Sequence, residues 1–169
     1  MELVRKIFDC VLVLKRKERT DMRGSMTVVY EDISGFEVKE TRIYEMPKAG
    51  TFIGIHYRDV SDPMTKLVTV IRGRGMDYVI DLREDSPTYL KWEKLELNAK
   101  DCLAVLIPAG IGHAFLSLED DTVQVYSVDA CGSGARSKQL NYLDPKIGLA
   151  LDGEVRFISD YDRGAPFLS

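Results

Sequence analysis

The sequence of 169 residues is poor in the residues that build disulfide frameworks and metal sites. Its three cysteines, Cys10, Cys102 and Cys131, lie far apart and form no CxxC pair, so we expect reduced thiols. Histidine occurs only at His56 and His113, which excludes a cluster of several histidines around a metal within one subunit. The carboxylates show no spacing typical of metal ligands, and no metal site is expected.

The sequence also lacks a basic excess and a long apolar run. Its 23 Lys and Arg residues against 27 Asp and Glu residues give a formal net charge of -4 and a pI near 5.3, which argues against a nucleic-acid-binding protein. No apolar run approaches the roughly 20 residues of a membrane span. The N-terminal residues contain no signal-peptide hydrophobic region. We therefore expect a cytoplasmic protein that binds neither nucleic acid nor membranes.

The sequence does contain a succession of short strand-like segments separated by turns. Its 45% hydrophobic and 30% charged residues are typical of a soluble globular protein, and its length suits a single domain over residues 1–169. Many short strands at this spacing predict an all-β antiparallel sandwich or jelly roll with only short helices. The predicted strands cover residues 10–14, 25–30, 41–44, 51–57, 66–71, 76–82, 92–97, 102–107, 113–118 and 122–128.

The predicted strand over residues 66–71 carries apolar residues on both of its faces. Such a strand is covered on both sides, either inside a sandwich or by a second subunit. Sheet packing between two copies of the chain is a natural way to hide the second face. The sequence therefore predicts a homodimer.

The strand predicted around His56 combines a titratable side chain with a glycine. Period-two alternation places Phe52, Gly54, His56 and Arg58 on one face. A glycine beside the imidazole leaves room for a ligand against the backbone. Lys66 begins the next strand, close enough in sequence to return to the same pocket. A single histidine in a strand is more often a packed or surface residue than a catalyst, so this pattern alone does not identify a site.

The strand over residues 122–128 presents polar side chains where a core is expected. Alternation places Thr122, Gln124 and Tyr126 on one face. A buried polar face is costly unless it lines a hydrated cavity, so this strand is predicted to form a pocket wall. A core tyrosine with a locally satisfied hydroxyl is an equally good interpretation of Tyr126 alone.

His113 follows a Pro-Ala-Gly turn and enters another predicted strand. Asp77 and Asp81 share one face of the strand over residues 76–82, so a buried His113 is predicted to pair with one of them, preferably Asp77. On this pattern a structural imidazole is the favoured role. The acidic segment over residues 158–163 is compatible with a solvated surface run.

Several short fragments, taken in order, resemble a known family. They include Gly-Ile-His-Tyr at 54–57, Gly-His-Ala-Phe at 112–115 and Ser-Asp-Tyr-Asp at 159–162. The shared order and intervals of the fragments resemble the dTDP-4-dehydrorhamnose 3,5-epimerase family over nearly the whole chain. The full set is 21–24, 54–57, 66–68, 81–83, 86–88, 107–108, 112–115, 126, 144–145, 147–148 and 159–162.

This resemblance implies a cupin-type jelly-roll barrel with short peripheral helices, usually dimeric, that works without a metal or an organic cofactor. By resemblance, His56 is the general base and Asp162 is the carboxylate paired with it. Lys66 is similar to the lysine near the keto oxygen of the sugar. Tyr126 is similar to the acid that returns a proton on the opposite face.

The resemblance also implies a binding site for a nucleotide-diphosphate 4-keto sugar. His113 is similar to a second pocket histidine, and Arg23 to an arginine that contacts the nucleotide diphosphate. Typical members carry an arginine where this chain has Ile53, which removes a bidentate phosphate contact. Arg58 and Arg42 are the candidates to replace that contact. The catalytic set is therefore intact, whereas the nucleotide-binding set is reduced.

The residue types suit epimerisation next to a ketone. A 4-keto group acidifies the hydrogens on C3 and C5, and a cation such as Lys66 at O4 stabilises the enolate. Histidine supplies a base that titrates near neutral pH, and a carboxylate fixes its tautomer. Inversion then requires a proton from the other face, which Tyr126 would donate.

Three functions remain open on the sequence alone. The first is an epimerase that inverts C3, C5 or both in a nucleotide-activated 4-keto-6-deoxy sugar. The second is a related keto-sugar isomerase that moves the carbonyl with the same base. The third is a catalytically silent cupin-fold sugar-binding protein, which has no need for both a base and an opposed acid.

Overall fold

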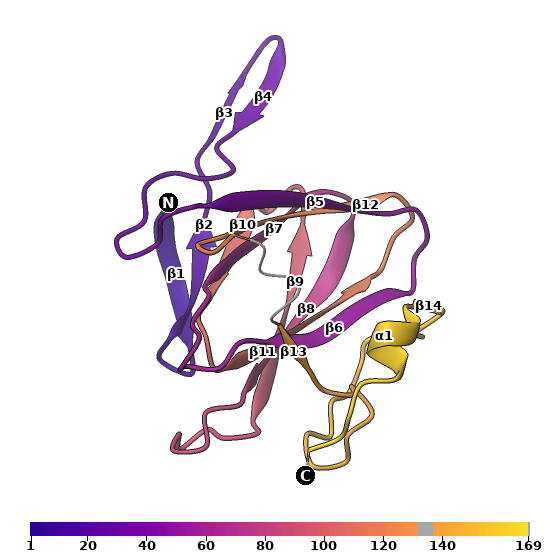
Figure 1. Ribbon diagram of the computed structural model, residues 1–169. Coiled ribbons are helices and arrows are strands. Elements are labelled where there is room, and N and C mark those ends of the chain that lie inside the picture. The colour runs from indigo at the N-terminus through magenta and orange to yellow at the C-terminus, as the bar shows by residue number, and fades with distance from the viewer. Residues whose placement is uncertain (132–136, 169) are drawn as a thin grey trace.

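The structure is a computed structural model that describes residues 1–131 and 137–168, and almost all of its regular elements are strands. The one helix in the described residues, α1, is a single turn that lies against the body of the molecule (Figure 1). None of the helices in the described ranges is long and apolar enough to cross a membrane. The elements are β1 (Glu2–Ile7), β2 (Val11–Lys15), β3 (Glu18–Asp21), β4 (Gly24–Thr27), β5 (Glu40–Met46), β6 (Thr51–Tyr57), β7 (Lys66–Arg72), β8 (Arg74–Asp81), β9 (Trp92–Asn98), β10 (Leu103–Ile107), β11 (Ile111–Ser117), β12 (Thr122–Val128), β13 (Lys138–Gln139), β14 (Phe157–Ile158) and α1 (Asp160–Arg163).

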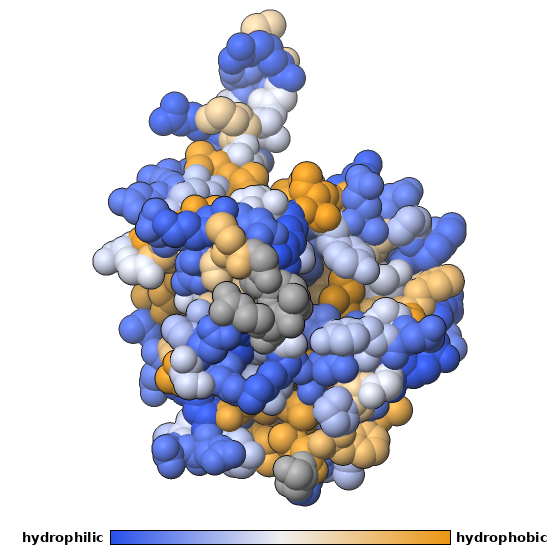
Figure 2. Space-filling model, in the orientation of Figure 1, coloured by the Kyte–Doolittle hydropathy of each residue, from blue (hydrophilic) through white to orange (hydrophobic). Residues whose placement is uncertain are grey.

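Two large sheets pack face to face, which confirms the antiparallel jelly roll (Figure 1). The first sheet has the order β1-β2-β10-β7-β12-β5, and the second has the order β13-β6-β11-β8-β9, with β14 added parallel to β6. The two sheets remain separate in hydrogen bonding, so the barrel is not closed. A separate hairpin, β3–β4, projects from the sandwich and is mostly hydrophilic (Figures 1 and 2).

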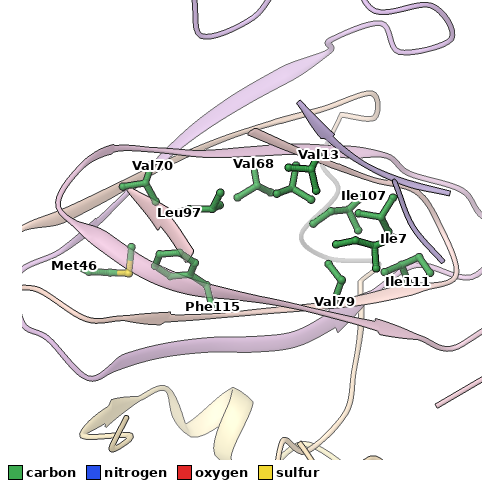
Figure 3. Close-up of a cluster of buried hydrophobic side chains, with 12 residues drawn as sticks. Ile7, Val13, Met46, Val68, Val70, Val79, Leu97, Ile107, Ile111 and Phe115 are labelled. Carbon is green, nitrogen blue, oxygen red and sulfur yellow. The ribbon is translucent and has the colours of Figure 1, made fainter. Parts of the chain in front are cut away.

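The main core fills the space between the two sheets. Val68 and Val70 of β7 pack with Val79 of β8, Leu97 of β9 and Phe115 of β11 (Figure 3). All five side chains are at most 1% exposed. Burying each of these side chains stabilises the fold by roughly 1.5–3 kcal/mol before entropy is counted. The core therefore fixes the distance between the sheets that form the pocket.

Both outer faces of the sandwich are covered in part by this chain itself. On the first sheet, Leu67 packs with Phe36 from the segment before β5. On the second sheet, Phe52 and Tyr78 pack with Leu140 and Ile147 from the C-terminal segment. The outer face of β7 is therefore covered at Leu67 by a segment of the same chain, which accounts for an apolar residue on that face.

Each of the ten predicted strands overlaps an observed one, but two longer strands escaped prediction. β1 is exposed except at Ile7, and all four residues of β3 are exposed. A strand with no buried face shows no hydrophobic alternation, so the sequence carries no signal for it. Hydrogen bonding to a neighbouring strand defines these elements instead.

The predicted alternation along β6 is wrong around Gly54. The register between β6 and β11 shifts there, because His113 pairs with His56 while Phe115 pairs with Ile53. One extra residue in β6 turns Ile53 and His56 to the same side, whereas Phe52 joins the outer core. Gly54 has a φ of 125°, and a Cβ there would lie 2.6 Å from the Ala114 Cβ, so the glycine permits close strand packing and leaves no ligand space.

The buried Asp81 carboxylate generates a prediction about stability. Burial alone would raise the pKa of Asp81, but hydrogen bonds from Arg83, Ser86 and Thr88 outweigh it and hold the pKa below its usual range. A lowered carboxyl pKa stabilises the fold above about pH 4, and this contribution is lost as the pH falls further. We expect Asp81→Asn to lower the free energy of unfolding by about 2 kcal/mol at pH 7.

Urea titrations from pH 7 to pH 3 test this expectation, and the difference between wild type and Asp81→Asn should narrow as the pH falls. Glu84→Gln is the matched control, because Glu84 is an exposed carboxylate in the following turn. Equal effects of the two substitutions would contradict the assigned role of the Asp81 network.

Candidate active site

A pocket opens between the two sheets. The first sheet contributes Lys66 from β7, Gln124 and Tyr126 from β12, and Arg42 and Tyr44 from β5. This confirms that Gln124 and Tyr126 form a polar pocket wall, whereas Thr122 is buried away from the pocket and donates to the Glu119 carbonyl. The second sheet contributes Ile53, His56, His113 and Phe115.

His56 and Asp162 form a hydrogen-bonded pair at the edge of this pocket. His56 Nε2 lies 2.6 Å from Asp162 Oδ1, and the backbone N–H of Gly54 donates to the other carboxylate oxygen at 3.3 Å. Asp162 is only 4% exposed. Since Nε2 is bonded to the carboxylate, Nδ1 is the ring nitrogen left to exchange a proton with a ligand.

Local capping explains how Asp162 reaches His56. Ser159 is the N-cap of α1, and its hydroxyl oxygen accepts a hydrogen bond from the backbone N–H of Asp162 at 3.0 Å. This bond starts a single helical turn that directs Asp162 inward. It also brings Tyr161 into the pocket wall, with its ring centre 6.1 Å from that of His56.

His113 and Asp77 form a second pair, as the sequence predicted. His113 Nε2 lies 2.7 Å from Asp77 Oδ1, and the Asp77 side chain is fully buried. His113 is also paired with His56 in the β6–β11 register, so the two imidazoles come from neighbouring strands. His113 therefore has both a structural partner and a place in the pocket wall.

Lys66 lies across the pocket from the histidines, at the first residue of β7. Burial is the main cause that lowers the pKa of its ammonium from 10.5 to about 8. The Asp77 carboxylate opposes this shift, while the guanidinium groups of Arg42 and Arg58 add to it. Lys66 thus provides a desolvated cation, whose attraction for a developing negative charge is stronger than in water.

Tyr126 and His56 approach the pocket from opposite sheets. Tyr126 stands on β12 of the first sheet and His56 on β6 of the second. Arg42 of β5 donates a hydrogen bond from Nη1 to the Tyr126 hydroxyl at 3.4 Å. A ligand between the sheets would therefore meet an imidazole on one side and a phenol on the other.

Two predicted binding residues lie outside this pocket. Arg23 is at the tip of the β3–β4 hairpin, where its side chain is 86% exposed and paired with Asp21. Arg58 is buried, and its guanidinium pairs with Asp62. The structure brings together His56, Asp162, Lys66, Tyr126 and His113.

Sequence reasoning missed part of the pocket wall. Tyr161 lies in a segment that the sequence predicts to be a solvated acidic run, and Tyr44 was not among the predicted site residues. Arg42 was considered only as a replacement for the arginine absent at Ile53, and the structure places both residues in the wall. Period-two alternation from Arg42 to Tyr44 along β5 was the one available signal. Within residues 1–131 and 137–168, no group of three or more His, Cys, Asp or Glu side chains could hold a metal ion.

Comparison with known proteins gives matches over almost the whole chain. The family model described as dTDP-4-dehydrorhamnose 3,5-epimerase matches residues 6–169. A dTDP-4-dehydro-6-deoxyglucose 3-epimerase from Streptomyces bikiniensis is 39% identical over 121 residues, 71% of this chain and 62% of that protein. A dTDP-4-dehydrorhamnose 3,5-epimerase from Mycolicibacterium smegmatis is 33% identical over 158 residues, 89% of this chain and 78% of that protein. The chain thus spans less than two thirds of the first of these relatives.

Solved structures agree with the sequence matches. A dTDP-4-dehydrorhamnose 3,5-epimerase from Bacillus anthracis with TDP and PPi bound has a TM-score of 0.92 at 26% identity, covering 99% of both chains. A 3'-monoepimerase from Streptomyces bikiniensis in complex with dTDP-quinovose has a TM-score of 0.85 at 32% identity, covering 93% of this chain and 83% of that one. The chain therefore belongs to the dTDP-4-dehydrorhamnose 3,5-epimerase family.

Proposed function

We propose that the protein is an epimerase of a nucleotide-activated 4-keto-6-deoxy sugar in deoxysugar biosynthesis. It inverts C3, C5 or both without a metal or cofactor, as a single cupin-like domain in the cytoplasm. The observation that carries the proposal is the opposition of the His56–Asp162 pair and Tyr126 across one pocket that also contains Lys66. Relatives named as 3-epimerases and as 3,5-epimerases both match, so the family alone leaves the number of inverted centres open.

The first step is removal of a proton from a carbon beside the C4 ketone. His56 accepts this proton, and the Asp162 carboxylate stabilises the resulting imidazolium. Because Asp162 is nearly fully buried, it holds the ring in one orientation. The electron pair left on carbon moves into an enolate, whose negative charge develops at O4.

The second requirement is stabilisation of that enolate. The desolvated Lys66 ammonium in the pocket wall is the cation we assign to O4. Arg58 does not line the pocket, and its positive charge acts against the ammonium, since it helps to lower the pKa of Lys66. Tyr126 then donates a proton to the face opposite His56, which inverts the carbon and re-forms the ketone.

Two further residues are assigned to substrate binding. We assign His113 to the sugar, because it borders the pocket beside His56. Arg23 is assigned to the nucleotide diphosphate, although it lies on a projecting hairpin of its own chain. In a homodimer the hairpin of one copy would supply Arg23 to the pocket of the other.

Solvent exchange tests the proposed reaction directly. The protein is incubated with dTDP-4-dehydro-6-deoxyglucose in deuterated water, and C3 and C5 are followed by NMR. We expect deuterium at C3, C5 or both, with the ketone still at C4 and inverted product accumulating. Migration of the carbonyl would indicate an isomerase, and absence of exchange with several nucleotides would indicate a binding protein.

Substitution of the base and the acid should separate exchange from inversion. We expect His56→Ala to abolish exchange at every carbon, because the base is removed. Tyr126→Phe should retain part of the exchange but lower inversion by about 100-fold or more, the scale of a lost general acid. Tyr89→Phe is the matched control, since Tyr89 is an exposed tyrosine outside the pocket. Full inversion by Tyr126→Phe would contradict its role.

The shifted pKa of Lys66 gives the reaction an expected pH dependence. The ammonium is present below about pH 8 and is lost as the pH rises through that value. We therefore expect kcat/KM to fall about tenfold per pH unit above pH 8, since the neutral amine stabilises the enolate poorly. Lys66→Arg should remove this decline because arginine stays charged. Lys48→Arg, an exposed lysine, is the control, and a flat wild-type profile to pH 10 would refute the assignment.

A further inference from the structure

Arg42, in the middle of β5, contacts Tyr126 in two ways. Its Nη1 donates to the Tyr126 hydroxyl at 3.4 Å, and its guanidinium carbon lies 5.6 Å from the centre of the Tyr126 ring. The β5–β12 register places the two residues directly opposite each other. Side chains in that relation project from neighbouring strands to the same face. Arg42 therefore contacts both the ring and the hydroxyl of Tyr126, the proposed acid.

Glu40 holds the same guanidinium from β5 itself. Arg42 Nε pairs with the Glu40 carboxylate, and the two side chains are 29% and 32% exposed. Glu40 and Arg42 are two residues apart, so they share one face of the strand. A planar guanidinium anchored through Nε holds its other nitrogens in a fixed direction, and Nη1 here faces the phenol.

We propose that Arg42 is a positioning residue for the proton-donating step, which orients the Tyr126 hydroxyl and stabilises the phenolate left after the proton departs. This inference rests on the proposed function, in which Tyr126 is the acid. It gives Arg42 a role that the sequence did not suggest, since an arginine was sought there only to contact phosphate.

The O–H bond of Tyr126 breaks and a C–H bond forms at the enolate carbon, whose electron pair accepts the proton while the C4 carbonyl re-forms. Tyr126 is left as a phenolate, and a proton from water restores it before the next turnover. A hydrogen bond from a guanidinium is shorter and stronger when its acceptor is ionised. The Arg42 contact therefore strengthens along the reaction, which is the condition for raising its rate.

The competing role for Arg42 is a phosphate contact in place of the arginine missing at Ile53. The two roles differ in what they affect. A phosphate contact controls substrate affinity, whereas a contact with Tyr126 controls inversion after exchange has begun. Measuring the rate of exchange, the rate of inversion and the affinity for the nucleotide therefore distinguishes the two roles.

The test compares wild type with Arg42→Gln and Arg42→Lys in deuterated water containing dTDP-4-dehydro-6-deoxyglucose. We expect Arg42→Gln to slow inversion by about 10- to 100-fold, the scale of a hydrogen bond to a charged group. Deuterium exchange, which depends on His56, should change by less than about threefold. Affinity for dTDP, measured by calorimetry, should stay within about twofold. Arg42→Lys should recover part of the inversion rate, because it keeps the charge but not the planar fork.

Two further variants complete the test. Arg72→Gln is the matched control, since Arg72 lies on neighbouring β7, bonds the Asp121 carbonyl and does not line the pocket. In a Tyr126→Phe background, Arg42→Gln should cause no further loss of inversion. If Arg42→Gln fails to fold in circular dichroism, Glu40→Gln releases the same guanidinium and should slow inversion with exchange preserved.

Several results would overturn the inference. Inversion by Arg42→Gln at the wild-type rate would show that Tyr126 does not need the guanidinium. A tenfold loss of dTDP affinity at unchanged kcat would assign Arg42 to the phosphates instead. Parallel loss of exchange and inversion would indicate a general disturbance of the pocket. In each of these cases the wild-type protein still shows exchange and inversion, so the proposed function is unaffected. Absence of exchange in the wild type would instead overturn the proposed function itself.

Discussion

The hydrogen bond between His56 and Asp162 is the interaction on which the rest of the site depends. It joins β6 of the second sheet, between β13 and β11, to the single turn of α1. The same carboxylate also receives the backbone N–H of Gly54, where the register of β6 shifts. One buried aspartate thus fixes the orientation of the imidazole and the path of the strand that carries it. Neither feature would have the same geometry without the other.

The two-sheet architecture places side chains on opposite sides of the pocket, as the proposed inversion requires. A strand alternates its side chains between its two faces, so one strand cannot approach a ligand from both sides. Two sheets packed over one core place His56 on one wall and Tyr126 on the other. Lys66 and Arg42 come from strands on either side of β12, so the cations gather on the wall that carries the phenol. The fold thereby separates the proposed base from the proposed acid and its neighbouring charges.

Much of this arrangement follows from the sequence, for identifiable reasons. Half-buried strands show strong alternation of apolar and polar residues. The ten predicted strands, the polar wall of β12 and the pairing of His113 with Asp77 were therefore predictable from the sequence. The bulge at Gly54 was not, because an added residue in a strand leaves the local pattern of residue types unchanged. Arg42 and Tyr161 were missed because their place in the pocket depends on strand register and on the N-cap at Ser159. The family resemblance assigned Arg23 to the nucleotide-binding site. Within one chain, however, the β3–β4 hairpin holds Arg23 away from the pocket.

The position of Asp162 in the chain also governs when the site can form. The bond to His56 closes a separation of 106 residues, with β7 through β14 between the two partners. Contacts so distant in sequence are costly in entropy to establish first, and they follow more local pairing. During synthesis the ribosome must release residues 159–163 before the imidazole gains its carboxylate. A nascent chain can therefore assemble most of its sheets before the proposed base has its carboxylate partner.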